Sequence, residues 1–395
     1  MKKIAILFGG ILLMFICSCN HKKNKSDIED NNSTHIKVNL HSNDNIRIND
    51  YLQYTSFIVL ETTNDNLISL IDKILFFKSH IYILDSKQGS IFIFDDKGKY
   101  LSKIDRRGEG PDEYITADDF VIDQLNNQIQ IYDGTSGHII NYSYSGEFLD
   151  KKKVAAGYAL TLLKNGNWLL HTGYGSGNQL NNLHNILLYD KDFKLIESFL
   201  PYNESLAGHK YTVATAKSVF SEYNNTTYIL PLLSNNIYSY NENTNQMECN
   251  YKIIFSGDEN SYIDENSTPL EIAHFRSQLI NGEIASKIHC FYKTGSVVFF
   301  QFFYQKKLFF CLYNENTRET QCSSKTLFDD NGLFFVPVVY YSDKWQDKVL
   351  SIIDGELFAI SKQMDKTNNP VIKEISKSIE SEDTNPILVF YNQSN

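Results

Sequence analysis

The chain has 395 residues, and 37 lysines and arginines stand against 47 aspartates and glutamates, giving a net charge of −10. Binding to nucleic-acid phosphates needs a basic face, so this balance argues against a nucleic-acid partner. No segment after residue 18 approaches the length and apolar character of a membrane-spanning helix.

The N-terminus predicts an export signal over residues 1–18. Two lysines precede an apolar run, residues 4–16, that is too short for a stable bilayer anchor. The sequence ICSC that follows resembles a bacterial lipobox, with Cys19 as the lipidated first residue of the mature protein. Two alternatives are an ordinary secretory signal cleaved nearby and lipidation at Cys17, where a bulky isoleucine before the cysteine disfavours cleavage.

Residues 19–34 are polar without an apolar period, which predicts a flexible, lipid-bearing tether before the folded domain of residues 35–395. Acyl chains on Cys19 would hold the protein to a membrane. We expect this to be the outer membrane of the cell envelope, on either its periplasmic or its surface face. Without residues 1–18 the charge is −12, which argues against adsorption to anionic lipid as a general mechanism.

The folded domain contains an internal sequence repeat. The segments that begin at Tyr82 and Ile131 align with 48 residues between matching positions, and later segments repeat the pattern less closely. The aligned pairs are Asp85 and Asp133, Ile91 and Ile139, Phe94 and Tyr142, Gly98 and Gly146, and Leu101 and Leu149. A further pair of copies reads YNENTNQMEC from Tyr240 and YNENTRETQC from Tyr313.

Each copy consists of strands rich in Ile, Tyr, Phe and Val, joined by short polar turns. Strand-and-turn units with a period of 40 to 50 residues are typical of propeller blades, so we predict an all-β fold, a six-bladed β-propeller. A seven-bladed ring is the nearest alternative. Strands over residues 56–61 and 385–391 should pair and close the ring. The predicted blades cover residues 70–104, 117–153, 158–200, 213–256, 290–328 and 333–391.

Two helices interrupt the strand pattern. Thr268 and Glu271 are spaced as a capping box, Pro269 suits the first helical position, and Gly282 marks the end. We expect this inserted helix on the propeller surface, either as a packing element or as a lid. A shorter helix is predicted near the C-terminus, with Ile372, Ile375 and Ile379 on one face.

The sequence RRGEGPDEY, residues 106–114, links the first two blades. With the FDDKGKYLSKID before it and the strands after it, it resembles the six-bladed β-propeller lipoproteins of Bacteroidetes, which are similar to NHL repeats. The resemblance covers nearly all of the mature chain and implies this fold and export, but no particular reaction. The residues that match the family pattern are Arg107, Gly108, Gly110, Pro111, Glu113 and Tyr114.

This linker could be a phosphate loop, a structural corner or a ligand site. Pro111 lacks the N–H that a phosphate would need and Glu113 would repel the anion, so a phosphate loop is disfavoured. As a corner, two glycines would allow a tight reversal, Tyr114 would pack between blades, and Arg106 or Arg107 would pair with Glu113. A ligand site at the same four side chains remains the alternative.

The remaining candidate ligand-binding residues are His171, which precedes a glycine-rich loop, and Tyr174 within that loop. Tyr202, Tyr223 and Trp345 are further aromatic residues that we expect to be exposed. The histidines lack metal-ligand spacing and no nucleophile elbow occurs, so we expect no metal, no cofactor and no catalytic residue.

The four cysteines beyond the lipobox contain no C-x-x-C pair. Cys311 and Cys322 would face each other if residues 314–319 close a hairpin, so either a disulfide or two buried thiols can occur there. The states of Cys249 and Cys290 stay open.

These features predict an exported, lipid-anchored propeller that binds a protein, peptide or glycan at the cell envelope without catalysis. A scaffolding role in an envelope complex is one alternative. The other is a lyase or hydrolase with its active site in the central channel, which would need several convergent polar side chains at one mouth.

Overall fold

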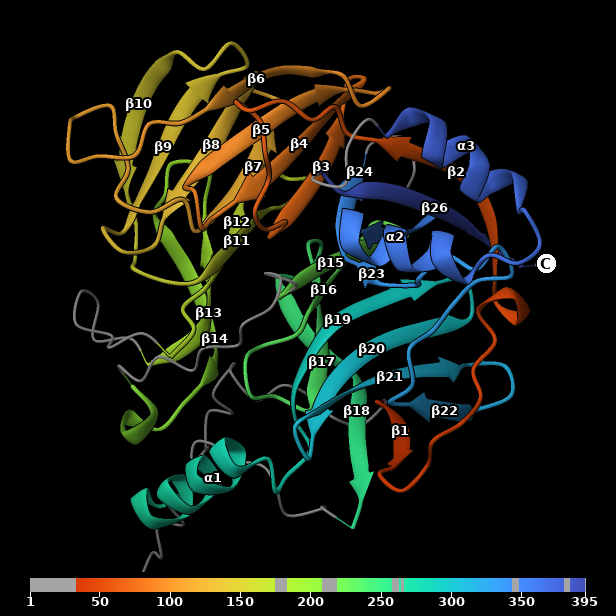
Figure 1. Ribbon diagram of the computed structural model, residues 1–395. Helices are drawn as coiled ribbons and strands as arrows, with labels where there is room; N and C mark the ends of the chain where they lie inside the picture. The colour runs from red at the N-terminus through yellow and green to blue at the C-terminus, as the bar shows by residue number, and fades with distance from the viewer. Residues whose placement is uncertain are drawn as a thin grey trace, which may run out of the picture.

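A computed structural model describes residues 33–174, 183–207, 219–257, 263, 266–342, 348–379 and 384–394. Six antiparallel sheets stand around a common centre, which confirms the predicted six-bladed β-propeller and excludes the seven-bladed alternative (Figure 1). The innermost strand of each blade lines the axis, and successive strands lie farther outward.

The first three blades are regular four-stranded units. Blade 1 consists of β3 (Lys73–Phe77), β4 (His80–Asp85), β5 (Ser90–Asp95) and β6 (Tyr100–Ile104). Blade 2 consists of β7 (Asp119–Asp123), β8 (Gln128–Asp133), β9 (His138–Ser143) and β10 (Phe148–Lys153). Blade 3 consists of β11 (Ala159–Leu162), β12 (Trp168–His171), β13 (His184–Tyr189) and β14 (Leu195–Pro201).

The other three blades combine strands from distant parts of the chain. Blade 4 consists of β15 (Phe220–Tyr223), β16 (Thr226–Ile229), β17 (Asn236–Asn241) and β18 (Gln246–Ser256), with β1 (Thr34–Asn39) added in parallel outside β18. Blade 5 consists of β19 (Ser286–Thr294), β20 (Val297–Tyr304), β21 (Lys307–Asn314) and β22 (Glu319–Ser323). Blade 6 consists of β23 (Pro337–Val338), β25 (Lys348–Ile353), β26 (Ile387–Gln393) and β2 (Leu52–Val59).

The two ends of the chain close the ring as predicted. β2 pairs antiparallel with β26, so that Ser56 lies opposite Phe390 and Val59 opposite Ile387. A second junction forms where β24 (Tyr340–Ser342) pairs in parallel with β3 of blade 1. Both junctions supply partners for strand edges that would otherwise expose unpaired backbone groups.

The hydrophobic core lies between neighbouring blades. One cluster joins blades 5, 6 and 1, and others fill the boundaries between blades 1 and 2, 2 and 3, 3 and 4, and 4 and 5. Phe299, Phe300 and Phe302, from the most aromatic segment of the sequence, are fully buried in these clusters. The high aromatic content is therefore largely explained by packing between blades.

The repeated turn residues have two roles: Gly98 allows close packing between blades, and the aspartates hold the turns of their own blades. Gly98 in blade 1 has φ +87°, and a Cβ atom there would lie 2.2 Å from the carbonyl oxygen of Val59 in blade 6. Asp85 and its repeat equivalent Asp133 accept backbone N–H bonds from Gln88 and Ser136 respectively. These residues serve the turns, as their repetition predicts.

The strand directions define two faces of the ring. The inner strands of all blades begin at one face, here called the start face, and end at the other, here called the end face. Among the described residues, the connections between blades and the turns between second and third strands lie at the start face. The turns between first and second strands, and between third and fourth strands, lie at the end face.

The predicted surface helix is α1 (Pro269–Asn281), which ends at Gly282 with φ +73° and carries the full capping box. Ile272 and Phe275 of α1 are buried. Ile272 joins a satellite cluster with Leu206 of the short 3₁₀ helix η2 (Glu204–Leu206) at the start face. α1 is therefore attached to the start face through its own small apolar cluster.

The predicted C-terminal helix is α3 (Pro370–Ser378), with Ile372 and Ile375 buried. Sequence reasoning missed a third helix, α2 (Gly355–Met364), which begins after the cap residue Asp354. Its apolar run LFAI reads equally well as a strand, so local pattern did not distinguish the two. A 3₁₀ turn, η1 (Ile48–Asp50), completes the helical elements in the part of the chain that the structure describes. None of the described helices has the length and apolarity needed to cross a membrane.

Candidate functional site

The linker of residues 106–114 folds as a corner that joins blades 1 and 2. The Tyr114 side chain is fully buried, and its hydroxyl donates to the Gly89 carbonyl oxygen at 2.6 Å. The same hydroxyl accepts a hydrogen bond from the Arg106 N–H at 3.0 Å. Burial raises the pKa of Tyr114 to about 12, so the hydroxyl stays protonated and can donate. The predicted packing of Tyr114 between the two blades is thus confirmed.

The charged residues of this corner pair differently from the prediction. The Glu113 carboxylate accepts the Gly110 N–H at 2.8 Å, and a Cβ atom on Gly108 would lie 1.9 Å from that carboxylate. The cation–anion contact is between Arg106 and Asp112 at 3.8 Å, not between an arginine and Glu113. Glu113 therefore acts locally, because the tight turn brings its carboxylate back onto the backbone of the glycines.

Arg107 is exposed, but its methylene groups pack over the blade 1 turn, where a Cβ on Gly89 would lie 3.2 Å from Arg107 Cδ. Lys151 of blade 2 donates to the Glu113 carbonyl oxygen at 2.9 Å, and the Tyr142 hydroxyl donates to the Asp112 carbonyl oxygen at 2.7 Å. These bonds fix the corner to blade 2 as firmly as Tyr114 fixes it to blade 1.

His171 and Tyr174 lie at the start face and are both buried. His171 Nε2 accepts the Leu232 N–H at 3.4 Å, and burial lowers the pKa of His171 to about 3, so its ring is neutral at pH 7. The Tyr174 hydroxyl donates to the Leu232 carbonyl oxygen at 2.9 Å, and its ring packs against Tyr202.

The expectation that Tyr174 and Tyr202 are exposed is wrong. Their rings lie 5.1 Å apart in an edge-on arrangement and belong to the satellite cluster under α1. Tyr174 is covered because Ile272 of α1 packs in the same apolar cluster, while residues 175–182 of the glycine-rich loop lie outside the described residues. Tyr223 is half-buried and its hydroxyl accepts the Gly295 N–H at 2.8 Å, while Trp345 lies outside the described residues.

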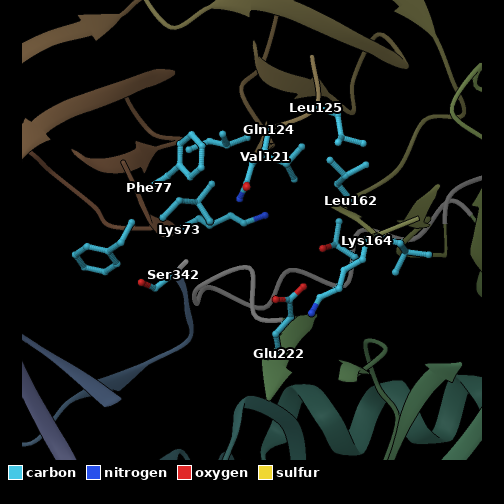
Figure 2. A pocket seen from close by; sticks show the side chains of 14 residues that line it. Lys73, Phe77, Val121, Gln124, Leu125, Leu162, Lys164, Glu222 and Ser342 are labelled. Atoms are coloured by element: carbon cyan, nitrogen blue, oxygen red, sulfur yellow. The ribbon is translucent and has the colours of Figure 1, made fainter. Parts of the chain in front are cut away.

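A cavity of about 440 Å³ lies at the axis and opens toward the end face; we call it the central cavity (Figure 2). Its walls come from the innermost strands of blades 1, 2, 3 and 4, and none of the six predicted ligand-binding residues lines it. The lining residues are Lys73, Leu75, Phe76, Phe77, Val121, Ile122, Gln124, Leu125, Thr161, Leu162, Leu163, Lys164, Glu222 and Ser342.

The inner end of the central cavity is held by an ion pair. Lys73 Nζ lies 2.8 Å from Asp119 Oδ1, and the two side chains are only 4% and 1% exposed. The other carboxylate oxygen of Asp119 accepts the Leu160 N–H at 2.8 Å. The pair therefore joins the inner strands of blades 1, 2 and 3 around the axis.

The outer part of the cavity carries opposite charges on neighbouring blades. Lys164 of blade 3 and Glu222 of blade 4 both point into the opening with Gln124 across from them (Figure 2). Lys164 Nζ donates to Asn225 Oδ1. The Glu222 carboxylate makes no hydrogen bond or ion pair within the described part of the chain, and burial raises its pKa, which Lys164 and Lys73 partly offset.

This arrangement can bind a ligand that has both apolar and polar groups. Phe77, Leu125 and Leu162 offer apolar contact area, while Gln124, Lys164 and Glu222 offer hydrogen-bond donors and acceptors that would orient a ligand. No cluster of three His, Cys, Asp or Glu side chains suited to a metal ion occurs among the described residues.

Sequence reasoning missed this site because its residues are widely spaced in the chain and belong to different blades. One local signal was present. Lys73 begins the otherwise apolar strand β3, Asp119 directly precedes three apolar residues in β7, and a buried charge at such a position requires a partner nearby.

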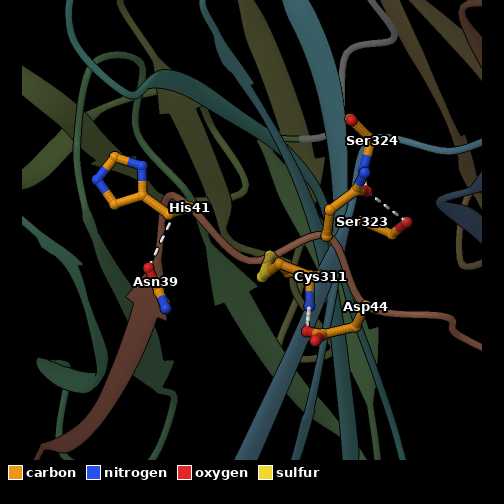
Figure 3. The surroundings of a disulfide bond; sticks show 8 residues. Asn39, His41, Asp44, Cys311, Ser323 and Ser324 are labelled. Atoms are coloured by element: carbon orange, nitrogen blue, oxygen red, sulfur yellow. Dashed lines mark hydrogen bonds between the residues drawn. A yellow bond between two sulfur atoms is a disulfide. The ribbon is translucent and has the colours of Figure 1, made fainter.

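A cross-strand disulfide joins Cys311 and Cys322 of blade 5 (Figure 3). It resolves the alternative left open by the sequence in favour of a disulfide. The N-terminal segment lies over this pair, because the Asp44 carboxylate accepts the Cys322 N–H at 2.9 Å and the Cys322 carbonyl oxygen accepts the Asp44 N–H at 2.9 Å. Cys249 and Cys290 are buried thiols, and their sulfurs contact the carbonyl oxygens of Tyr251 and Pro337.

Comparison with known proteins places the chain in a family. The profile of a domain of unknown function, DUF4934, matches residues 32–392. No curated protein matches the sequence significantly.

Two solved structures have similar folds. A protein of Bacteroides fragilis assigned as exported matches with a TM-score of 0.70 and 19% identity over 92% of this chain and 100% of its own. A member of the DUF4221 family from Bacteroides vulgatus matches with a TM-score of 0.51 and 10% identity over 87% of this chain and 97% of its own. At these identities the likeness concerns the fold.

Proposed function

The chain belongs to the DUF4934 family, and on that premise we propose that it is an exported, lipid-anchored binding module without catalytic activity. Its ligand is a protein segment, peptide or glycan of the cell envelope, bound in the central cavity. The observation that carries this proposal is the convergence of four blades on one cavity of about 440 Å³ with both apolar and charged lining.

The ligand contacts follow from the chemistry of the lining. Glu222 accepts hydrogen bonds from hydroxyl or amino groups, Lys164 and Gln124 donate to oxygen atoms, and Phe77 gives a flat apolar surface. Sugar rings and peptides both carry such mixed polar and apolar faces. The paired Lys73 and Asp119 make the inner end of the cavity rigid, which reduces the ordering cost of binding.

Binding is tested with residues 20–395, which contain every strand of the ring, on glycan and peptide arrays. Glu222→Gln and Lys164→Ala should each weaken binding of any ligand found by about tenfold, the loss expected for one hydrogen bond to a charged group. Lys366→Ala, on the exposed connection between α2 and α3, is the matched control and should bind normally. If both cavity variants bind the array ligands as well as the wild type does, the central cavity is not the ligand site.

The envelope location is tested separately from ligand binding. Cys19→Ala should move the protein from the membrane fraction to the soluble fraction, because the acyl chains on Cys19 are its proposed attachment. Retention of the variant in the membrane fraction contradicts the lipid anchor at this residue. Affinity capture of the native lipoprotein then distinguishes a soluble ligand from stable association with an envelope complex, the scaffolding role.

A further inference from the structure

A second cavity lies on the outer rim of the ring between blades 4 and 5; we call it the rim groove. It has a volume of about 210 Å³ and is separate from the central cavity. One wall is β1, the first strand after the tether, and the other is the outer strand of blade 5. The lining residues are His35, Lys37, Asn39, Ser42, Arg318, Thr320 and Cys322.

The lining is cationic in a protein that is acidic overall. Lys37 and Arg318 supply positive charge, and none of the lining residues is acidic. The alternation of β1 places its polar residues on the groove side: residues 35, 37 and 39 face outward, while Ile36 and Val38 are buried in the core. Neither Lys37 nor Arg318 forms an ion pair within the residues that the structure describes.

One acidic residue of the same hairpin is held elsewhere. Glu315 lies in the same hairpin as Arg318, but its carboxylate pairs with Lys293 and accepts the Tyr251 hydroxyl. Glu319, the next residue in the chain, forms no ion pair with Arg318 among the described residues, so the charge of Arg318 is not neutralised within its own hairpin. Asn39 adds a hydrogen-bond donor to the same groove. Its side-chain oxygen already accepts the His41 N–H at 3.0 Å (Figure 3), which leaves the Asn39 amide group as a donor.

Arg318 occupies a backbone conformation that arginine rarely adopts. Its φ is +60°, and the repeat equivalent in blade 4 is Asn245, with φ +52°. The two turns share the same scaffold, because Asn241 and Asn314 each accept N–H bonds from the residues two and three positions later. Asparagine tolerates a positive φ better than arginine. The blade 5 turn therefore has a less favourable residue, Arg318, at the position that Asn245 occupies in the blade 4 turn.

We propose that the rim groove binds a phosphoryl or sulfuryl oxyanion. Arginine recognises such groups through paired N–H donors, lysine adds a second positive charge, and the Ser42 and Thr320 hydroxyls donate further hydrogen bonds. The oxyanion has two potential sources, the headgroup of an anionic lipid or a soluble phosphorylated or sulfated molecule. The negative net charge of the chain opposes broad adsorption to an anionic membrane. Binding is therefore proposed for a single oxyanion in the groove and not for the membrane surface as a whole.

The position of the groove makes a lipid source sterically feasible. β1 begins at Thr34, the last residue of the proposed tether of residues 19–34, so the groove lies next to the segment that would join the propeller to its anchor. A headgroup bound there would set the orientation of the ring relative to the membrane. The inference does not depend on the central cavity, and either can fail without the other.

The test uses residues 20–395, inorganic phosphate and sulfate in calorimetric titrations, and vesicles of phosphatidylcholine with or without phosphatidylglycerol in co-sedimentation. Arg318→Asn copies the blade 4 turn and should keep or raise the midpoint of thermal unfolding, while oxyanion affinity falls about tenfold. Lys37→Gln should give a similar loss of affinity. Lys307→Gln, which removes a cation of blade 5 outside the groove, should bind as the wild type does.

Two results support the groove and identify the source. A lipid headgroup is indicated if the wild type binds phosphatidylglycerol vesicles but binds free phosphate only weakly, and if Arg318→Asn loses the vesicle binding. Binding of phosphate or sulfate without a preference for anionic vesicles indicates a soluble ligand. The proposal is overturned if wild type binds none of these probes, or if both Arg318→Asn and Lys37→Gln bind as tightly as wild type. Salt should weaken the binding in either supporting case.

Discussion

Lys73 Nζ lies 2.8 Å from Asp119 Oδ1, and this buried ion pair connects the inner strands of blades 1 and 2 at the centre of the ring. The Leu160 N–H of blade 3 donates to the same carboxylate. Three of the six blades thus meet at one charged contact, which also forms the inner end of the central cavity.

Lys73→Met should destabilise the fold by about 3–5 kcal/mol, because it leaves the Asp119 carboxylate buried without its cation. The double variant Lys73→Met/Asp119→Asn should lose less, since the neutral amide oxygen still accepts the Leu160 N–H. Urea unfolding of the wild type, both single variants and the double variant measures this coupling. Equal destabilisation in Lys73→Met and the double variant would contradict it.

Tyr114→Phe tests the corner between blades 1 and 2. The change removes the hydrogen bonds that the Tyr114 hydroxyl makes with the Gly89 carbonyl oxygen and the Arg106 N–H, so it should cost about 1–3 kcal/mol of unfolding free energy. Tyr144→Phe is the matched control, because the Tyr144 hydroxyl is buried without a hydrogen-bond partner in the described residues. We expect that control to be neutral or slightly stabilising; comparable losses in both variants would contradict a special role for Tyr114.

Glu222 gives the central cavity a pH dependence. Burial raises its pKa above the ordinary value of 4.5, so ionisation of this side chain disfavours the folded state. The penalty is present at pH values above the folded pKa and disappears below the unfolded pKa. Glu222→Gln should therefore be more stable than wild type at pH 7, and the difference should shrink as the pH falls to about 4. Denaturant titrations across that range measure it, and a difference that grows on acidification would refute the assignment.

The disulfide gives a further prediction. Cys311→Ser/Cys322→Ser should lower the free energy of unfolding by about 2–4 kcal/mol, as expected for a short closed loop. In residues 20–395, denatured but unreduced protein should show only Cys249 and Cys290 as reactive thiols. Alkylation followed by mass spectrometry counts them. Four reactive thiols before reduction would show that the bond does not form in the exported protein.

Much of the fold could be predicted from local pattern. The 48-residue offset between Asp85 and Asp133 gave the blade period, and the capping box at Thr268 gave the start of α1 to the residue. α2 was missed because its apolar run fits a strand as well as a helix. The repeat also explained Asp85 and Asp133 correctly, since each holds the turn of its own blade.

The candidate sites were harder to predict, because burial depends on which segments meet in space. Tyr174 looked like an exposed residue of a glycine-rich loop, yet α1 and Tyr202 cover it. The charged residues of the corner at 106–114 suggested a ligand site, but the corner forms hydrogen bonds with blades 1 and 2 instead. The central cavity was not predicted, because its polar residues are far apart in the sequence and come together only where the inner strands of different blades meet.

The sequence by itself determined the blade period and the pairing of the two chain ends. These features depend on neighbours along the chain or on repetition, which a single sequence displays directly. Only the tertiary structure decided which charges are paired, as Lys73 with Asp119, and which face a cavity, as Glu222 and Arg318. The physical reason is that ring closure brings inner strands from distant blades to one axis and lays β1 beside blade 5. Charge pairing and solvent access are properties of those long-range contacts.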